Sequence, residues 1–175
     1  MSYLQKLSLI LGEKTKILYH GTNIKLDRIK DATGGWVEFG GIFANDDLEV
    51  AESHGKFIYE MELPYSAILT QQELDYHIDA NRLEKILVNE TGIDLDNKDD
   101  LDVLWKAVID DEPDIDNSDR LIEILRPNGD VGVAGLEAQA LRGKIAKTLG
   151  YKAVEMLDEH GKSYLVLPSV EIKLI

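Results

Sequence analysis

Leu18-Tyr19-His20-Gly21-Thr22 is followed in this chain by Gly40-Gly41-Ile42-Phe43-Ala44 and then by Val50-Ala51-Glu52-Ser53-His54-Gly55. The first segment has the pattern of an apolar strand that ends in an imidazole, a bare backbone and a hydroxyl, groups that suit a sugar and an amide. The second segment places two glycines before an apolar strand, and the third predicts a short helix that ends in His-Gly. Because glycine has no Cβ, a ligand or another backbone can approach closely there.

The composition predicts one α+β domain with a single core, since the chain has 175 residues, of which 44% are hydrophobic. We find neither an apolar run of eighteen residues nor a basic-then-apolar leader, so we expect a soluble, cytoplasmic protein without a membrane partner. The chain has no cysteine, which excludes disulfides, thiolate nucleophiles and cysteine-bound metals. The four histidines are scattered, so no metal site is predicted.

The formal net charge of −14 argues against direct nucleic-acid binding, because phosphate contacts need clustered Lys and Arg. The charge is concentrated between residues 90 and 119, where twelve Asp or Glu accompany two Lys. This stretch is either a solvated face or a docking surface for a protein with a basic surface. The oligomeric state stays open.

Hydrophobic periodicity and turn residues predict an order of elements along the chain. We expect helices over 2–11, 47–53, 81–90, 98–109, 118–125 and 135–149, and strands over 16–19, 42–44, 57–63, 153–157, 164–167 and 170–174, with a tight turn at 158–161. Gly55 is expected to end its helix with a positive φ. Residues 66–130 are interpreted as an acidic helical insertion packed on the sheet of a single domain, 1–175.

The strand–acidic turn–strand pattern around Asp158, Glu159 and Gly161, with the helical segment 137–143 before it, completes a set of three segments. In this order they resemble the ADP-ribosyltransferases, in particular the branch whose first motif is a histidine. The likeness is greatest to the phage-borne anti-CRISPR ADP-ribosyltransferases that act on type I-F surveillance complexes. It covers roughly residues 16–65 and 135–175 and leaves out the acidic middle.

The resemblance implies a split, mixed and antiparallel β-sheet core with flanking helices, NAD as co-substrate and a protein target, plausibly a subunit of a CRISPR effector. In that family a carboxylate grips the nicotinamide ribose, where positive charge develops as the bond to nicotinamide breaks. Asp158 is our first candidate for this carboxylate. Glu155, whose strand position could face solvent, and Glu159 are the other candidates.

The resemblance also implies a set of NAD-binding residues, namely Tyr19, His20, Gly21, Thr22, Gly41, Phe43, His54 and Arg142. His20 would hydrogen-bond a ribose hydroxyl, and the Gly21 backbone would hold the carboxamide. His54 stands where the histidine-first branch has a tyrosine that stacks on nicotinamide. Arg142 would hold the diphosphate or pair with a carboxylate of the sheet. Structural roles stay open for several of these residues, including a core position for Phe43.

Two functions from other classes stay open on the sequence alone. In the first, catalysis is lost and the protein is an acidic module that blocks a basic, nucleic-acid-binding partner by charge mimicry. In the second, the chain is an NAD-consuming toxin or an enzyme similar to RNA 2′-phosphotransferases. The last of these should need basic residues for RNA, and such residues are scarce here.

Overall fold

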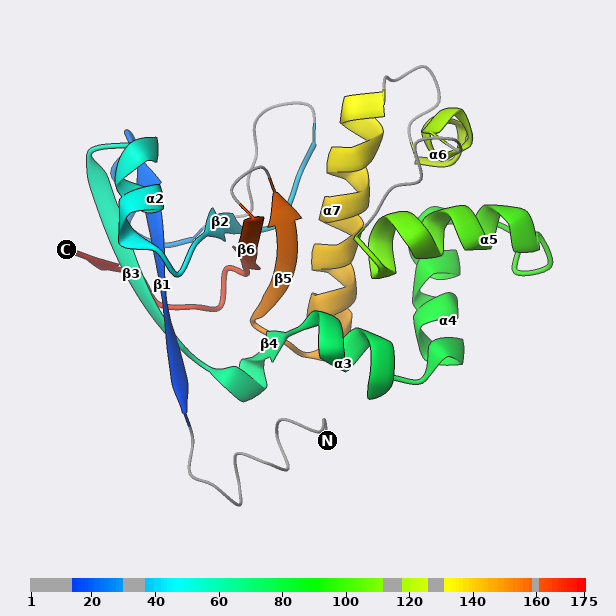
Figure 1. Cartoon of the computed structure of the whole chain (residues 1–175), viewed down its shortest axis with the longest axis horizontal. Coiled ribbons are helices and arrows are strands. Elements are labelled where there is room, and N and C mark those ends of the chain that lie inside the picture. Colours follow the sequence, from blue (N-terminus) through cyan, green and yellow to red (C-terminus); the bar gives the residue numbers. More distant parts are fainter. Residues whose placement is uncertain (1–13, 30–36, 112–117, 126–130, 159–160) are drawn as a thin grey trace.

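The computed structural model describes residues 14–29, 37–111, 118–125, 131–158 and 161–175, and it has two β-sheets at one end and a group of helices at the other (Figure 1). Between them lies the long helix α7, Val131–Leu149, which packs against the sheet to which β5 belongs. The α+β class expected from the sequence is therefore confirmed, and the described strands form two sheets.

The first sheet is antiparallel and has the order β1-β3-β7, with β1 at Thr15–Thr22, β3 at Phe57–Pro64 and β7 at Lys173–Leu174. Leu18 of β1 pairs with Met61 of β3, and both side chains are buried. β1 is longer than the predicted strand 16–19, because its ladder with β3 continues through the polar residues His20 to Thr22.

The second sheet is mixed and has the order β2-β6-β5-β4, with β2 at Ile42–Ala44, β6 at Gly161–Val166, β5 at Ala153–Asp158 and β4 at Ile68–Leu69. Only the β4–β5 pair is parallel. The two sheets meet at a single bridge between Tyr19 and Asn45, which exchange backbone hydrogen bonds of 2.7 and 2.9 Å.

Several of the shorter helices begin directly after a polar residue whose side chain caps the helix. They are α2 at Leu48–His54, the 3₁₀ turn η1 at Tyr65–Ala67, α3 at Gln71–Tyr76, α4 at Ala80–Thr91, α5 at Lys98–Leu104 with the π-helical turn η2 at Trp105–Ile109, and α6 at Ser118–Leu125. Asp47, Thr70, Asp79 and Asn97 each accept a backbone N–H in the first turn of the helix that they precede.

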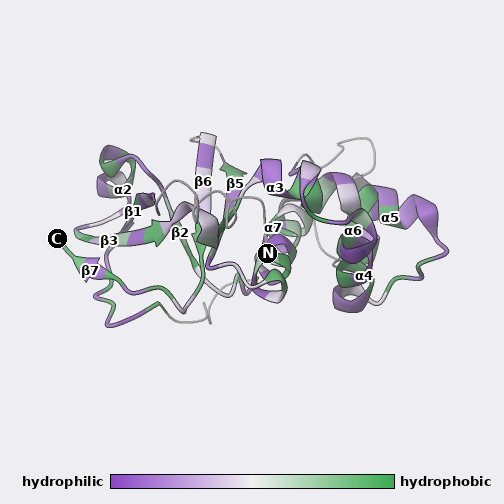
Figure 2. Cartoon of the chain, turned by 90° about the horizontal axis from the view of Figure 1, so that it is seen from below, coloured by the Kyte–Doolittle hydropathy of each residue, from purple (hydrophilic) through white to green (hydrophobic). Residues whose placement is uncertain are grey.

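The helices and one face of the second sheet share a hydrophobic core. Leu83, Leu104, Ile145, Val154 and Leu165 are among its fully buried members and come from α4, α5, α7, β5 and β6. Figure 2 shows hydrophobic and hydrophilic residues alternating along the helices of this end. A smaller cluster on the other face of the second sheet includes Leu18 and Met61 and joins the two sheets.

Several element predictions differ from the structure. Helix α3 and strand β4 were not predicted, because six and two residues are too short to show a period. The helix expected over 98–109 changes to a π-helical turn at Trp105, and the final edge strand is confined to Lys173–Leu174. The predicted helix 2–11 lies outside the described residues.

Two glycines allow α2 to lie directly on β1. A Cβ on Gly21 would be 1.7 Å from the carbonyl oxygen of Ala51, and a Cβ on Gly55 would be 2.2 Å from the carbonyl carbon of Thr22. The expected positive φ at Gly55 is wrong, since its φ of 169° is extended backbone. Close contact between helix and strand, not the conformation, therefore requires glycine there.

Gly21→Ala is expected to destabilise the protein by about 2–3 kcal/mol, because the clash is with backbone that cannot rotate away. Chemical denaturation of the two proteins measures this difference. Gly135→Ala is the matched control, since a Cβ there meets nothing within 4 Å and alanine is favoured in the interior of α7. Equal stability of the two variants would contradict the close packing of α2 on β1.

Candidate functional site

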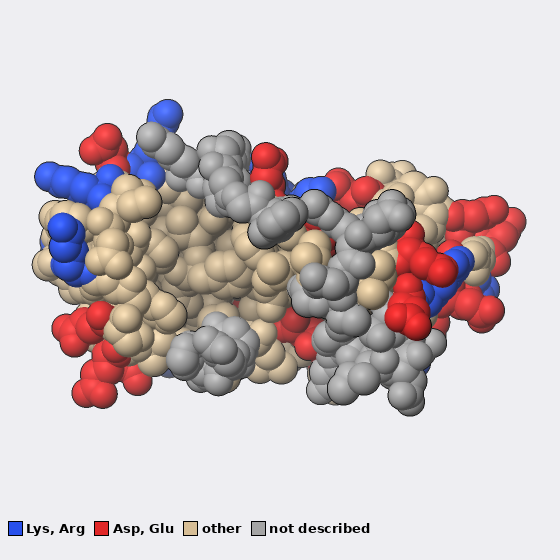
Figure 3. All heavy atoms as spheres, turned by 90° about the horizontal axis from the view of Figure 1, so that it is seen from above, with Lys and Arg blue, Asp and Glu red and all other residues tan. Residues whose placement is uncertain are grey.

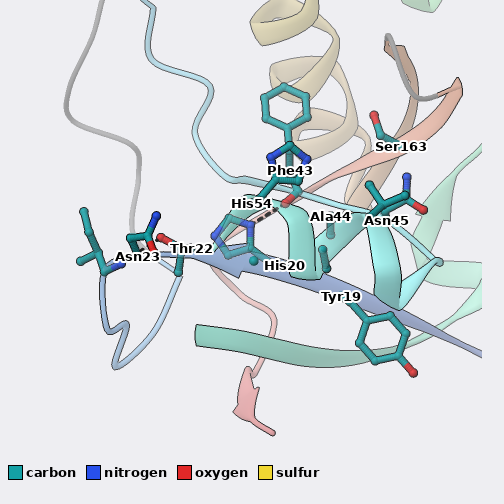
Figure 4. Close-up of a pocket in the computed structure, with 13 residues that line it drawn as sticks. Tyr19, His20, Thr22, Asn23, Phe43, Ala44, Asn45, His54 and Ser163 are labelled. Carbon is teal, nitrogen blue, oxygen red and sulfur yellow. Dashed lines mark hydrogen bonds between the residues drawn. The ribbon is translucent and has the colours of Figure 1, made fainter. Parts of the chain in front are cut away.

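A pocket of about 430 Å³ opens where the two sheets meet (Figure 4). It is lined by residues 19–24, by Phe43–Asn45, by Val50, Ala51 and His54 of α2, and by Ser163 of β6. Its volume lies within the usual range for small-molecule sites. The strand end, the second strand and the short helix with which the sequence analysis began thus line one pocket.

Asn45 fixes the floor of this pocket. Its backbone joins β1 through Tyr19, its side-chain Nδ2 donates to the carbonyl of Lys162 at 3.1 Å, and its Oδ1 accepts from the N–H of Asp47 at 2.8 Å. One buried residue therefore connects β1 through its backbone, and β6 and the start of α2 through its side chain. Buried polar groups that are satisfied in this way rigidify the elements that they join.

His20 is held in one tautomer. Its Nδ1 lies 2.6 Å from the carbonyl oxygen of Phe43, and since a carbonyl can only accept, Nδ1 carries the proton. Burial lowers the pKa of His20, the hydrogen bond to Phe43 opposes this, and the nearby His54 lowers it further. A neutral ring with Nδ1 protonated leaves Nε2 as a hydrogen-bond acceptor.

Gly21 presents its backbone to the open edge of β1. Tyr19 bonds to Asn45 on the side away from β3, so Tyr19 and Glu60 form a non-hydrogen-bonded pair of the β1–β3 ladder. Such pairs recur every second residue, which makes Gly21 opposite Ile58 the next one. The N–H and C=O of Gly21 therefore point to the same side as those of Tyr19, and no described strand pairs there beyond Asn45.

The other predicted NAD-binding residues of the first three segments differ in how they meet the pocket. Thr22, Phe43 and the exposed His54 line it. The ring of Tyr19 extends away from His20 in Figure 4, so this residue contributes mainly its backbone. Phe43 also packs edge-on against Phe39, with ring centroids 4.9 Å apart.

Gly41 and Arg142 lie outside the pocket lining. A Cβ on Gly41 would be 2.4 Å from the carbonyl oxygen of Val166, so the close approach there is made by β6. Arg142 is 1% exposed, and its guanidinium donates to the backbone oxygens of Glu155, Val108 and Ile109 and to Oε1 of Gln71. Its partners in the sheet and helices are thus a carboxamide and carbonyls instead of the carboxylate expected from the sequence.

Glu155 does not face solvent as its strand position suggested. It is 9% exposed, accepts the N–H of Gln71 at 2.9 Å and pairs with Lys162, and this carboxylate raises the pKa of Lys162. In the β5–β6 ladder it is opposite Tyr164, whereas Ser163, which lines the pocket, is opposite Met156. Glu155 and Ser163 therefore belong to opposite faces of the sheet.

Asp158 is the last residue of β5 and pairs with Gly161, the first residue of β6. The strand is held next to this end by Asp111, whose Oδ2 accepts the N–H of Leu157 at 2.6 Å. Asp111 has a φ of 58°, a left-handed conformation that Asp tolerates better than most residues. Glu159 lies outside the described residues.

Seven residues that line the pocket were not among the predicted site residues, namely Asn23, Ile24, Ala44, Asn45, Val50, Ala51 and Ser163. No sequence signal marks Ser163, because its place opposite Met156 depends on the register of β5 and β6.

The described residues contain no group of three or more His, Asp or Glu arranged to hold a metal ion. None of the described helices is both long and apolar enough to cross a bilayer.

Comparisons with known proteins agree with this geometry. Residues 17–174 match the family described as Anti-CRISPR Type I-F ADP-ribosyltransferase AcrIF11. A solved structure titled "Crystal structure of an anti-CRISPR protein" is similar to this chain with a TM-score of 0.68 and 28% identity, over 94% of this chain and 98% of that one. No curated protein sequence matches.

The likeness was expected to leave out the acidic middle of the chain, residues 66–130, and this expectation is wrong. The family match runs through these residues, and the alignment with the solved structure covers nearly all of both chains. The similar protein therefore has a counterpart of most of this chain. By its match over residues 17–174, the chain belongs to the anti-CRISPR type I-F ADP-ribosyltransferases of the AcrIF11 family, enzymes that use NAD as substrate.

Proposed function

We propose that the pocket binds the nicotinamide riboside half of NAD and that the protein transfers ADP-ribose to a basic subunit of a type I-F CRISPR effector. The open backbone edge at Gly21, beside the Nε2 acceptor of His20, is the observation that carries this proposal. The carboxamide of nicotinamide both donates and accepts hydrogen bonds, and it matches the adjacent C=O and N–H of one residue.

His20 and His54 would then act on the two ends of the nicotinamide–ribose bond. Nε2 of neutral His20 accepts a hydrogen bond from a ribose hydroxyl. The exposed imidazole of His54, in the same pocket, provides a face on which the nicotinamide ring can stack. Both interactions orient the bond to be broken without a change in protonation.

Asp158 is the carboxylate that fits this arrangement better than Glu155. Alternation along β5 assigns position 158 to the row of Val154 and Met156, and Met156 is the register partner of the pocket residue Ser163. Glu155 is on the other row and already has two partners. A carboxylate beside the ribose stabilises the positive charge that develops on its C1′ more in the transition state than in the ground state.

The reaction breaks the bond between C1′ and the nicotinamide nitrogen and forms one between C1′ and a nucleophilic atom of the target. Nicotinamide leaves as a neutral molecule, and the proton of the target group passes to solvent. The chain's part in this reaction is to bind the substrate, orient the bond to be broken and stabilise the charge that develops.

NAD is expected to raise the melting temperature of the protein, and His20→Gln should reduce this shift. Because the folded pKa of His20 is lowered below 6.5, the unfolded chain takes up the proton first as the pH falls. Stability should be complete above about pH 6.5 and decrease below it, NAD affinity should decrease at lower pH as folded His20 takes up its proton, and His20→Gln should weaken both dependences. Calorimetric titrations between pH 5 and 8 measure them. An absence of NAD binding at millimolar concentration would contradict the proposed function.

Asp158→Asn should lower ADP-ribose transfer by about 100- to 1,000-fold with little change in NAD affinity, because the carboxylate acts mainly in the transition state. Glu155→Gln is the matched control. It keeps an acceptor for Gln71 and loses the charge that pairs with Lys162, so it should lower the melting temperature more than the turnover. Transfer to a host lysate with labelled NAD gives the rates, and an active Asp158→Asn beside an inactive Glu155→Gln would reverse the assignment.

The helical end of the molecule carries the charge that would select the target. Figure 3 shows Asp and Glu gathered over the end that α4–α6 form, whereas the opposite end carries both signs. Within residues 90–119 the acidic residues differ in role. Asp100 is buried against Arg120, with contacts of 2.5 and 2.7 Å, whereas Asp96, Asp99 and Asp119 are exposed.

Neutralising Asp96, Asp99 and Asp119 to Asn should slow the modification of a basic target at low salt and flatten the dependence of this rate on salt. Hydrolysis of NAD without target should stay unchanged. The control is a variant with Glu38, Glu62 and Glu171 changed to Gln, exposed residues outside the helical end that give the same change in net charge. If both variants respond alike to salt, net charge alone is at work and no docking surface exists at α4–α6.

A further inference from the structure

Ser163 lines the pocket, and its hydroxyl is a buried polar group without a partner. Ser163 is 2% exposed, and within the described part of the chain its Oγ is the buried side-chain N or O atom for which no hydrogen bond is found. Buried hydroxyls nearly always have a hydrogen-bond partner, because a hydroxyl that leaves water without gaining one lowers the stability of the folded protein. A group that remains unsatisfied at the edge of a cavity points to a ligand.

The neighbours of Ser163 explain why no protein group satisfies it. Its register partner across the β5–β6 ladder is Met156, which offers only a weak acceptor. Asn45, which shares the pocket, has its amide directed to Lys162 and Asp47. The carbonyl of Phe43 is taken by His20. These nearby polar groups thus have other partners, and Ser163 lies in the lining of the pocket with its Oγ buried.

The chemistry of the pocket indicates which part of a ligand Ser163 would contact. None of the described residues that line the pocket is Lys or Arg, so the wall offers nothing to a diphosphate. It offers hydroxyls, amides and imidazoles, which suit uncharged polar groups. A serine hydroxyl both donates and accepts, and this combination matches another hydroxyl.

The register of the β5–β6 hairpin indicates which hydroxyls of a ligand Ser163 would contact. Asp158 pairs with Gly161, so Ser163, two residues beyond Gly161, is the diagonal neighbour of position 158 on one face. Diagonal neighbours in an antiparallel pair are about 7–8 Å apart. A ribose carries two adjacent hydroxyls, and it can bridge such a gap with one hydroxyl toward each residue.

We propose that Ser163 Oγ hydrogen-bonds a hydroxyl of the nicotinamide ribose, next to the hydroxyl that Asp158 takes. This assignment rests on the proposed function of the pocket. It makes Ser163 a substrate-binding residue, because NAD would supply the hydrogen-bond partner that its hydroxyl lacks in the free protein.

Ser163→Ala tests this proposal through two measurements, the melting temperature of the free protein and its affinity for NAD. The free variant should melt at the same temperature as wild type or higher, because no hydrogen bond is lost. Its affinity for NAD in calorimetric titration should be about 3- to 10-fold weaker, the effect of one hydrogen bond. Binding of nicotinamide alone, which has no ribose, should be unchanged.

Ser53→Ala is the matched control, since Ser53 Oγ already donates to the carbonyl of Val50 at 2.7 Å within α2, outside the pocket lining. It should leave NAD affinity as in wild type. Unchanged NAD affinity in Ser163→Ala would overturn the ribose contact while wild-type binding still upheld the proposed function. Equal weakening of NAD and nicotinamide, or a lower melting temperature in the free variant, would also overturn it, because either result indicates a structural role. Wild-type protein that binds no NAD would overturn both proposals.

Discussion

The junction of the two sheets at Asn45 is the constraint on which the pocket depends. β1 pairs with β3 over eight positions, whereas within the described residues its backbone pairs with that of the second sheet's side of the molecule at the Tyr19–Asn45 bridge alone. The Asn45 side chain reinforces this bridge by bonding to β6 on one side and to the first residues before α2 on the other. Because every wall of the pocket starts from one of these elements, a single buried amide sets their spacing.

A second buried group ties the helical end of the molecule to the strand that carries Asp158. β4 has only two residues, so none of the described strands lies beside this edge of β5 beyond Val154. Side chains complete this edge instead. Arg142 donates to the carbonyl of Glu155 at 2.9 Å, and Asp111 accepts from Leu157. Arg142 also satisfies the carbonyls at the end of η2, which as the end of a helix lack partners of their own.

The charge of Arg142 is balanced within this arrangement. Burial lowers the pKa of the guanidinium, and the carboxylates of Asp111, Glu155 and Asp75 oppose that effect. A buried cation is tolerated when its donors are satisfied and acids lie nearby, whereas removal of a partner leaves an uncompensated charge. Arg142 is thus better explained as the anchor between α7, η2 and β5 than as a ligand for diphosphate.

The local part of this structure could be predicted from the sequence, and the non-local part could not. His20 and Gly21 follow an apolar run, Phe43 follows two glycines, and α7 has a continuous apolar stripe, so their elements and the meeting of the first three segments could be inferred from short patterns. Ser163 and Arg142 show no such pattern. Their roles depend on which strand lies opposite and which helix covers the sheet, and register and packing are absent from a single sequence.

The acidic middle of the chain shows why charge alone was an incomplete guide. As a run of like charges, residues 90–119 indicate a solvated or docking face, and exposed members such as Asp96 fit that reading. Asp100 and Asp111 have the same charge but other functions, since one holds Arg120 between α5 and α6 and the other holds the end of β5. The segment that presents charge to a target is therefore also the segment that supports the strand end next to the pocket. A shift of the backbone at Asp111 would move its hydrogen bond to Leu157, the residue before Asp158. A change in the exposed charges of residues 90–119 would leave that hydrogen bond in place.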